Sequence, residues 1–139
     1  MQKISLDSLN ATSKGTLMEQ LGIVYTEIGA DYLCGTMPVD HRTIQPTGLL
    51  HGGASVAFAE TLGSLGSVVI TENKPTIVGI EINANHVRKV KEGFVHGRAT
   101  LVSRTRKLHV WDVRIQDDAG ELVCISRLTI MVIEPKTDK

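Results

Sequence analysis

One carboxylate interrupts the most apolar stretch of the chain. Residues 53–71 are mostly Ala, Leu, Val, Ser and Gly, and Glu60 is their only charged member. Burial of an unpaired carboxylate is costly and raises its pKa. A surface position on an amphipathic helix would explain the residue more simply, but Ala57, Phe58 and Leu62 leave little polar face around it. We interpret Glu60 as a candidate general base or nucleophile.

A glycine-rich segment, His51-Gly52-Gly53, leads into the same stretch. Free backbone N–H groups and the positive end of the helix dipole favour a developing negative charge at a helix start. An oxyanion formed from a carbonyl under attack would fit there. The segment is also consistent with a turn in which His51 caps the helix or packs as a ring, and both interpretations stay open.

The helical phase separates these two signals within one chain. His51 and Glu60 are nine residues apart, which at 100° per residue puts them on opposite sides of a helix and roughly 13 Å apart along its axis. Glu60 and Ser64 are four residues apart and share a face. One site could use all three residues if a second copy of the chain brought its helix alongside. The spacing therefore predicts a homodimer with shared active sites.

The elements around this helix are expected in a clear order. Residues 6–22 indicate a short helical region, and residues 23–39 indicate two strands joined at a Gly29-Ala30-Asp31 turn. A loop broken by Pro46 and several glycines then leads into a helix over residues 53–71. After Pro75, four segments are rich in strand-forming residues: 76–87, 94–105, 107–116 and 121–134.

Alternation of apolar and polar residues is clearest in the segment 109–116. Trp111, Val113 and Ile115 share one face, while Asp112 and Arg114 lie on the other. One face of the sheet is therefore expected to be buried. The pattern predicts one α+β domain over residues 1–139, in which a long antiparallel meander wraps the central helix.

Bulk composition limits the partners and the compartment. The 139 residues carry a net charge of zero, which argues against nucleic acid as a main partner. Cys34 and Cys124 lie ninety positions apart in the pattern of a reducing compartment. The start has no apolar run typical of a secretory signal, and residues 54–70 make a poor membrane span because they contain Glu60 and two glycines. We expect a cytoplasmic protein.

Several stretches, in this order and spacing, resemble one known family. They are LNATS, LGIVYT, MPVDHRTIQPTGLLHGGASVAFAETLGS, VGIEINANHVR and the closing SRLT. The chain resembles the hotdog-fold acyl-CoA thioesterases, in the branch of the 4-hydroxybenzoyl-CoA, 1,4-dihydroxy-2-naphthoyl-CoA and enterobactin-proofreading thioesterases. The resemblance implies a helix wrapped by an antiparallel sheet, and dimers that usually pair into tetramers.

The resemblance also implies a reaction and its residues. The reaction would be hydrolysis of an acyl-CoA or acyl-carrier thioester, with an aromatic acyl group, to a free acid and a thiol. Glu60 would act as nucleophile or general base, and the Gly52 amide would polarise the carbonyl. Gln45 and His51 would orient the thioester and assist the leaving group, and Ser64 would place water or Glu60. Thr47 departs from the branch, whose members often have an aromatic residue there that shapes the acyl pocket.

Two basic segments near predicted strand ends are expected to bind the nucleotide. CoA carries several phosphate charges, and basic side chains at strand ends can converge on one such ligand. Solvated charges that protect a sheet edge are the rival explanation. The first segment is residues 86–89 and the second is residues 104–107. The resemblance places CoA contacts at Gly79, within the first segment and around the second. Arg104-Thr105 stands where the family usually has a Leu-Gly pair. The residues are Gly79, His86, Val87, Arg88, Lys89, Ser103, Arg104, Thr105, Arg106, Lys107 and Leu108.

Two other functions on the same fold stay open at this stage. A hydratase or dehydratase would use His51 and a carboxylate as acid and base, and it would leave the thioester whole. A non-catalytic module would bind acyl-CoA without turnover.

His41, His96 and His109 show no partner pattern and are read as surface or packed residues, and no metal-ligand spacing is present. No metal or redox cofactor is expected.

Overall fold

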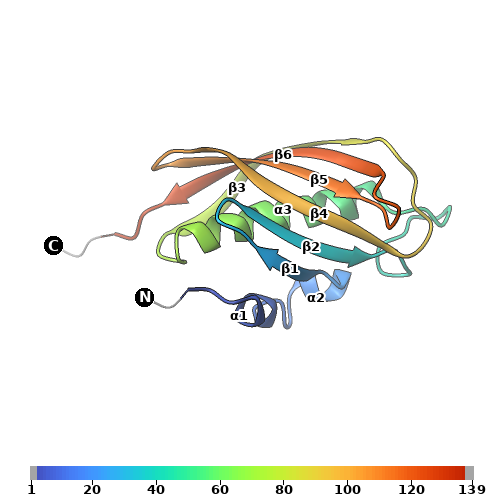
Figure 1. Cartoon of the computed structure of the whole chain (residues 1–139), viewed down its shortest axis with the longest axis horizontal. Coiled ribbons are helices and arrows are strands. Elements are labelled where there is room, and N and C mark those ends of the chain that lie inside the picture. Colours follow the sequence, from blue (N-terminus) through green and yellow to red (C-terminus); the bar gives the residue numbers. More distant parts are fainter. Residues whose placement is uncertain (1–2, 137–139) are drawn as a thin grey trace.

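The computed structural model describes residues 3–136, in which a six-stranded antiparallel sheet curls around one long helix (Figure 1). That helix, α3 (Gly52–Ile70), begins and ends one residue before its predicted bounds. The predicted wrapped helix and the α+β class are confirmed. The strands are β1 (Val24–Ile28), β2 (Tyr32–Pro38), β3 (Thr76–His86), β4 (Phe94–Arg104), β5 (Leu108–Gln116) and β6 (Leu122–Ile133).

The helical region before the first strand consists of two short helices, α1 (Leu6–Ala11) and α2 (Leu17–Leu21). Ser5 caps α1, because its side chain accepts a hydrogen bond from the Ser8 N–H. Gly22 ends α2 in the left-handed conformation, at a φ of 73°, which glycine adopts without steric cost. The chain then enters β1 directly.

The strand order is β1-β2-β4-β5-β6-β3, and this corrects the predicted simple meander. A meander would put β3 beside β4, but β2 takes that place and β3 pairs with β6 at the far edge. The connection from β3 to β4 is tied to the loop before α3, because Leu50 N–H donates to Val90 O and Val39 N–H donates to Gly93 O. These bonds hold the β3–β4 connection beside the start of α3, and the chain then enters β4 in the middle of the sheet.

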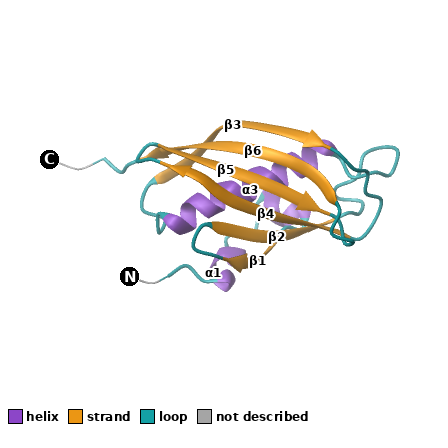
Figure 2. Ribbon diagram, turned by 45° about the horizontal axis from the view of Figure 1, so that its top comes forward, coloured by secondary structure: helices purple, strands orange, loops and turns teal. Residues whose placement is uncertain are grey.

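Of the two edge strands of the sheet, β1 is covered and β3 is open (Figure 2). At β1, the Asn10 side chain binds the backbone of the edge strand as a neighbouring strand would. Its Oδ1 accepts from Tyr25 N–H at 2.9 Å and its Nδ2 donates to Tyr25 O at 3.0 Å. At β3, no described strand or helix covers the outer edge. Val78 and Ile80 are 40% and 49% exposed there. An open apolar edge is a surface suited to pairing with another strand.

Small residues let α3 lie very close to the sheet. A Cβ at Gly97 would lie 2.5 Å from the Leu62 side chain, and a Cβ at Gly66 would lie 2.7 Å from the Trp111 ring. The alternation predicted for β5 is confirmed, since Trp111 and Ile115 are fully buried. By length and composition α3 could cross a membrane, but here it is the core helix and contacts β2 through β6.

Candidate active site

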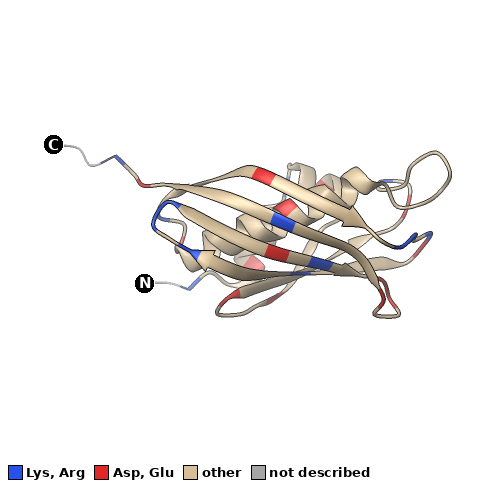
Figure 3. Ribbon diagram, turned by 90° about the horizontal axis from the view of Figure 1, so that it is seen from above, with Lys and Arg blue, Asp and Glu red and all other residues tan. Residues whose placement is uncertain are grey.

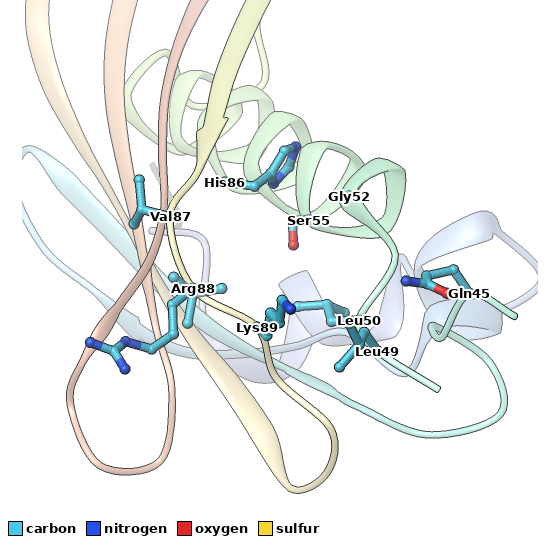
Figure 4. Close-up of a pocket in the computed structure, with 10 residues that line it drawn as sticks. Gln45, Leu49, Leu50, Gly52, Ser55, His86, Val87, Arg88 and Lys89 are labelled. Atoms are coloured by element: carbon cyan, nitrogen blue, oxygen red, sulfur yellow. The ribbon is translucent and has the colours of Figure 1, made fainter. Parts of the chain in front are cut away.

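A cavity of about 420 Å³ lies beside the N-terminus of α3 (Figure 4). Its wall comes from the loop before α3, the first turn of α3 and the end of β3. The sequence-predicted residues that meet here are Gln45, Gly52, His86, Val87, Arg88 and Lys89, joined by Leu49, Leu50, Ser55 and Val123. The His86 ring lies against Gly52, where a Cβ would be 3.0 Å from Nε2.

The first turn of α3 leaves one backbone donor free. The N–H groups of Ala54 and Ser55 donate to His51 O, and the Gly53 N–H donates to His51 Nδ1 at 2.8 Å. Within residues 3–136, the Gly52 N–H has no hydrogen-bond acceptor. It borders the cavity at the positive end of the helix dipole, so it can donate to a carbonyl oxygen or an oxyanion.

Gln45 is held so that its amide nitrogen is available. Its Oε1 accepts two hydrogen bonds from Thr47, from N–H at 2.6 Å and from Oγ1 at 2.8 Å. The amide NH2 group is therefore left to donate, and Figure 4 shows the Gln45 nitrogen turned toward the cavity. Thr47 is exposed, and its contact is with Gln45 rather than with an apolar pocket.

His51 is the N-cap of α3, which agrees with the interpretation of His51-Gly52-Gly53 as a capped turn. Because Nδ1 accepts from Gly53, the ring proton is on Nε2. The ring borders a different cavity from Gln45, one lined also by Leu17, Arg42 and Ala57. In one chain, His51 and Gln45 therefore do not border the same space.

Glu60 and Ser64 border a further cavity of about 300 Å³, which confirms that they share a face of α3. Leu17, Met18 and Leu65 make this cavity largely apolar. The half-buried Glu60 carboxylate lies against β3, since a Cβ at Gly79 would be 2.9 Å from Oε2. In the described part of the chain, the Glu60 carboxylate makes no hydrogen bond or ion pair. Its oxygens are free for a substrate or a water molecule.

The predicted separation of the two signals within one chain is confirmed. Gly52 and Glu60 border different cavities and are eight residues apart, about 12 Å along the helix axis. One chain therefore presents a carbonyl-binding half at one place and a carboxylate half at another.

The two basic segments lie at opposite ends of α3 in one chain. His86 contacts Gly52 at the start of α3, whereas Arg104 donates to Ile70 O at its end, at 3.3 Å. Figure 3 shows Lys and Arg at both ends of the molecule and also across the middle of the sheet. Within one chain the expected convergence of the two segments on one ligand does not occur. Arg104 also lies on an internal strand, so protection of a sheet edge does not explain it.

Other contacts gave no sequence signal. Leu17 and Met18 line the Glu60 cavity only because α2 packs on α3, which is tertiary packing. His96 pairs with Asp118 at 2.7 Å, and this pair holds the pKa of Asp118 below its usual range. His109 is packed, as expected, but it binds Ser67. Both cysteines are free, and residues 3–136 contain no cluster of three His, Cys, Asp or Glu suited to a metal ion.

Residues 47–124 match the family model described as the thioesterase superfamily. The chain belongs to the thioesterase superfamily. This thioesterase is 48% identical over 130 residues to the proofreading thioesterase EntH of Cronobacter sakazakii, covering 94% of this chain and 95% of that protein. It is 47% identical over 132 residues to the 1,4-dihydroxy-2-naphthoyl-CoA hydrolase of Escherichia coli K12, covering 95% and 97%.

A solved thioesterase structure from Haemophilus influenzae shares the fold of this thioesterase. The TM-score is 0.92 at 45% identity, covering 96% of this chain and 93% of that one. The predicted family and the hotdog fold are confirmed, and so is hydrolysis of acyl-CoA thioesters as the enzyme class. The dehydratase and the purely binding module are set aside.

Proposed function

We propose that this thioesterase hydrolyses aromatic acyl-CoA thioesters in sites that two copies of its single domain share. The observation that carries this proposal is the division of α3. A free Gly52 N–H and an oriented Gln45 amide border one cavity, while Glu60 and Ser64 border another. Each half lacks what the other supplies, because a carbonyl-binding site needs an attacking group and a carboxylate needs a bound electrophile.

The thioester oxygen accepts hydrogen bonds from Gly52 N–H and the Gln45 amide. Glu60 of the partner subunit then attacks the carbonyl carbon to give a mixed anhydride, or it takes a proton from a water molecule that attacks. In both routes the negative charge on the tetrahedral oxygen is stabilised by the same two donors. The C–S bond breaks, the thiolate takes a proton, and water supplies the new oxygen of the acid. Ser64 places the water or the carboxylate, and His51 assists through its free Nε2–H.

The open edge of β3 supports the dimer. Antiparallel pairing of two β3 edges would bury Val78 and Ile80 and set the two α3 helices side by side in opposite directions. The start of each helix would then face the middle of the other, where Glu60 lies against Gly79 of β3. We also propose a pairing of two dimers through the apolar outer-face patch that Leu108, Met131 and Ile133 form.

The basic residues near Gln45 support a CoA ester as substrate. His86, Arg88 and Lys89 surround the cavity, and Lys89 has no ion pair within residues 3–136. The second basic segment, Ser103 to Leu108, would come from another subunit, because one chain holds the two segments apart. An acyl-carrier thioester shares the reactive group but lacks the adenine nucleotide, so removal of these charges separates the two substrates.

The acyl group is proposed from the relatives and from the apolar wall at Glu60. The E. coli relative is named for a naphthoyl ester, and Leu17, Met18 and Leu65 would contact an aromatic ring held beside Glu60. We further propose that the protein works in the cytoplasm without a membrane, nucleic acid or cofactor. Its net charge of zero argues against nucleic acid as a partner, and its two free cysteines support this location.

The test is turnover of an acyl-CoA panel by Glu60→Gln, measured as released thiol. Loss of the carboxylate should lower kcat by about 10²- to 10⁴-fold with the fold and oligomer unchanged. Glu92→Gln is the matched control, because this exposed carboxylate lies on the loop before β4 and borders neither cavity. Wild-type turnover by Glu60→Gln would exclude the proposed role.

A further inference from the structure

A buried polar cluster joins the second half of α3 to the sheet. Its members are Ser67 on α3 and His109 and Trp111 on β5, each no more than 1% exposed. Trp111 Nε1–H donates to Ser67 Oγ at 2.8 Å, and Ser67 Oγ lies 2.8 Å from His109 Nδ1. Neither the proposed reaction nor the thioester site uses these three residues.

The hydrogen bonds favour one protonation state of the cluster. An indole N–H can only donate, so Ser67 Oγ accepts from Trp111 and can send its own proton to Nδ1 of His109. His109 is then neutral, with its proton on Nε2. A second proton on the ring would put an N–H on Nδ1, reverse the bond to Ser67 and leave a charge in the core.

The charged surroundings of His109 also oppose this second proton. From β4, Arg104 is paired with His109 in register, and its positive charge acts on the ring. From β6 the register partner is Ile130, and Glu60 is the only ionisable residue within α3, two turns before Ser67. Burial, together with Arg104, holds the pKa of His109 below its ordinary value of 6.5.

The same cluster sets how α3 lies on the sheet. Gly66 leaves room for the Trp111 ring, and Gly63 leaves room for Leu128, so the helix has little freedom to turn while these contacts hold. Ser67 is seven residues after Glu60, which is about two helical turns and nearly the same face. A small rotation of α3 at Ser67 would therefore move the Glu60 carboxylate away from Gly79.

We propose that Ser67, His109 and Trp111 are positioning residues that hold Glu60 in its reactive place, and that protonation of His109 releases this hold. This inference rests on the proposed role of Glu60. Acid would lower kcat through the cluster and change KM much less, because the CoA contacts proposed for the Gln45 cavity, at the other end of α3, are kept.

Trp111 allows a test that does not depend on activity. It is the only tryptophan in the chain, so intrinsic fluorescence reports the cluster directly. Emission, kcat and KM are measured between pH 8 and pH 4.5 for the wild type, for His109→Asn and for the control His41→Asn. Asparagine keeps an acceptor near the place of Nδ1 but cannot gain a charge. His41 is an exposed histidine on the surface loop.

The wild type should show a change in emission below pH 6.5 and a several-fold loss of kcat with the same midpoint. His109→Asn should lose the change in emission and move the acid loss of kcat to lower pH, and His41→Asn should match the wild type. If His109→Asn does not fold, Ser67→Ala is used, which removes both hydrogen bonds of the cluster and should lower kcat several-fold and shift the emission already at pH 8.

Two results would overturn the inference. One is flat wild-type emission over this range, and the other is a change in emission that His109→Asn abolishes without moving the acid loss of kcat. Failure of the proposed function would look different, because Glu60→Gln would then keep full turnover whatever the emission does.

Discussion

The carboxylate of Glu60 lies directly over the backbone of Gly79, so close that a Cβ there would be 2.9 Å from Oε2. The two residues come from α3 and from the edge strand β3, and their contact sets the carboxylate at the open edge of the sheet. A bulge follows at once, since the register with β6 shifts between Gly79 and Glu81. The acid that the sequence singles out thus meets the surface that another chain would cover.

Gly79→Ala should therefore displace Glu60 without unfolding the protein. The added methyl group meets the flexible end of a side chain, so the carboxylate shifts by a few tenths of an ångström or more. Because misplacement of about 1 Å can cost about 10²-fold in rate, we expect kcat to fall by about 10-fold or more at unchanged thermal stability. Thr26→Ala, at an exposed position on β1 at the opposite edge of the sheet, should keep wild-type kcat. An unchanged kcat in Gly79→Ala would mean that this contact does not set the reactive position.

Thr47→Val should weaken the orientation of Gln45. The substitution removes the Oγ1 hydrogen bond to Gln45 Oε1 and leaves the backbone one, so the amide is held by one bond instead of two. One hydrogen bond contributes about 0.5–1.5 kcal/mol, which predicts about a 2- to 10-fold loss in kcat/KM. Thr47→Ser should restore the activity. Equal activity of the Val and Ser variants would show that the hydroxyl has no part in catalysis.

The sequence predicted the elements well and their arrangement less completely. Alternation around Trp111 and the apolar run of α3 depend on local periodicity, and both are confirmed. The place of β3 beside β6 depends on how residues 87–93 are tied to the loop before α3, which no local pattern encodes. The predicted shared face of Glu60 and Ser64 followed from helical phase, whereas the contacts of Thr47 with Gln45 and of Ser67 with His109 required the tertiary structure.

Substitutions at His51 should separate its role as the N-cap of α3 from its proposed role in the reaction. His51→Ala removes the acceptor for the Gly53 N–H and should cost about 1 kcal/mol of unfolding free energy. His51→Asn keeps a good N-cap and should retain stability, but it lacks the Nε2–H and should lose kcat/KM. Urea unfolding and initial rates on the same preparations give both quantities. If His51→Asn is as active as the wild type, His51 serves only as the cap.

The buried state of His109 predicts the direction of a change in stability with pH. Its folded-state pKa lies below the ordinary 6.5 of the unfolded chain, so just below pH 6.5 the unfolded chain binds more protons. Stability should fall as pH drops through about 6.5 and level off below the folded-state pKa. His109→Asn should flatten this part of a curve of unfolding free energy against pH, measured in urea from pH 7.5 to 5. A curve with the wild-type slope would show that His109 does not contribute to it.

Subunit mixing tests the divided site most directly. Glu60→Gln and Gln45→Ala are each expected to be nearly inactive alone, and they are mixed in equal amounts under conditions that exchange subunits. In a two-fold dimer each mixed pair contains one site with Gln45 from one chain and Glu60 from the other, so about a quarter of wild-type activity should return. Activity that stays at the mean of the two separate variants, with exchange shown by native mass spectrometry, would contradict the shared site.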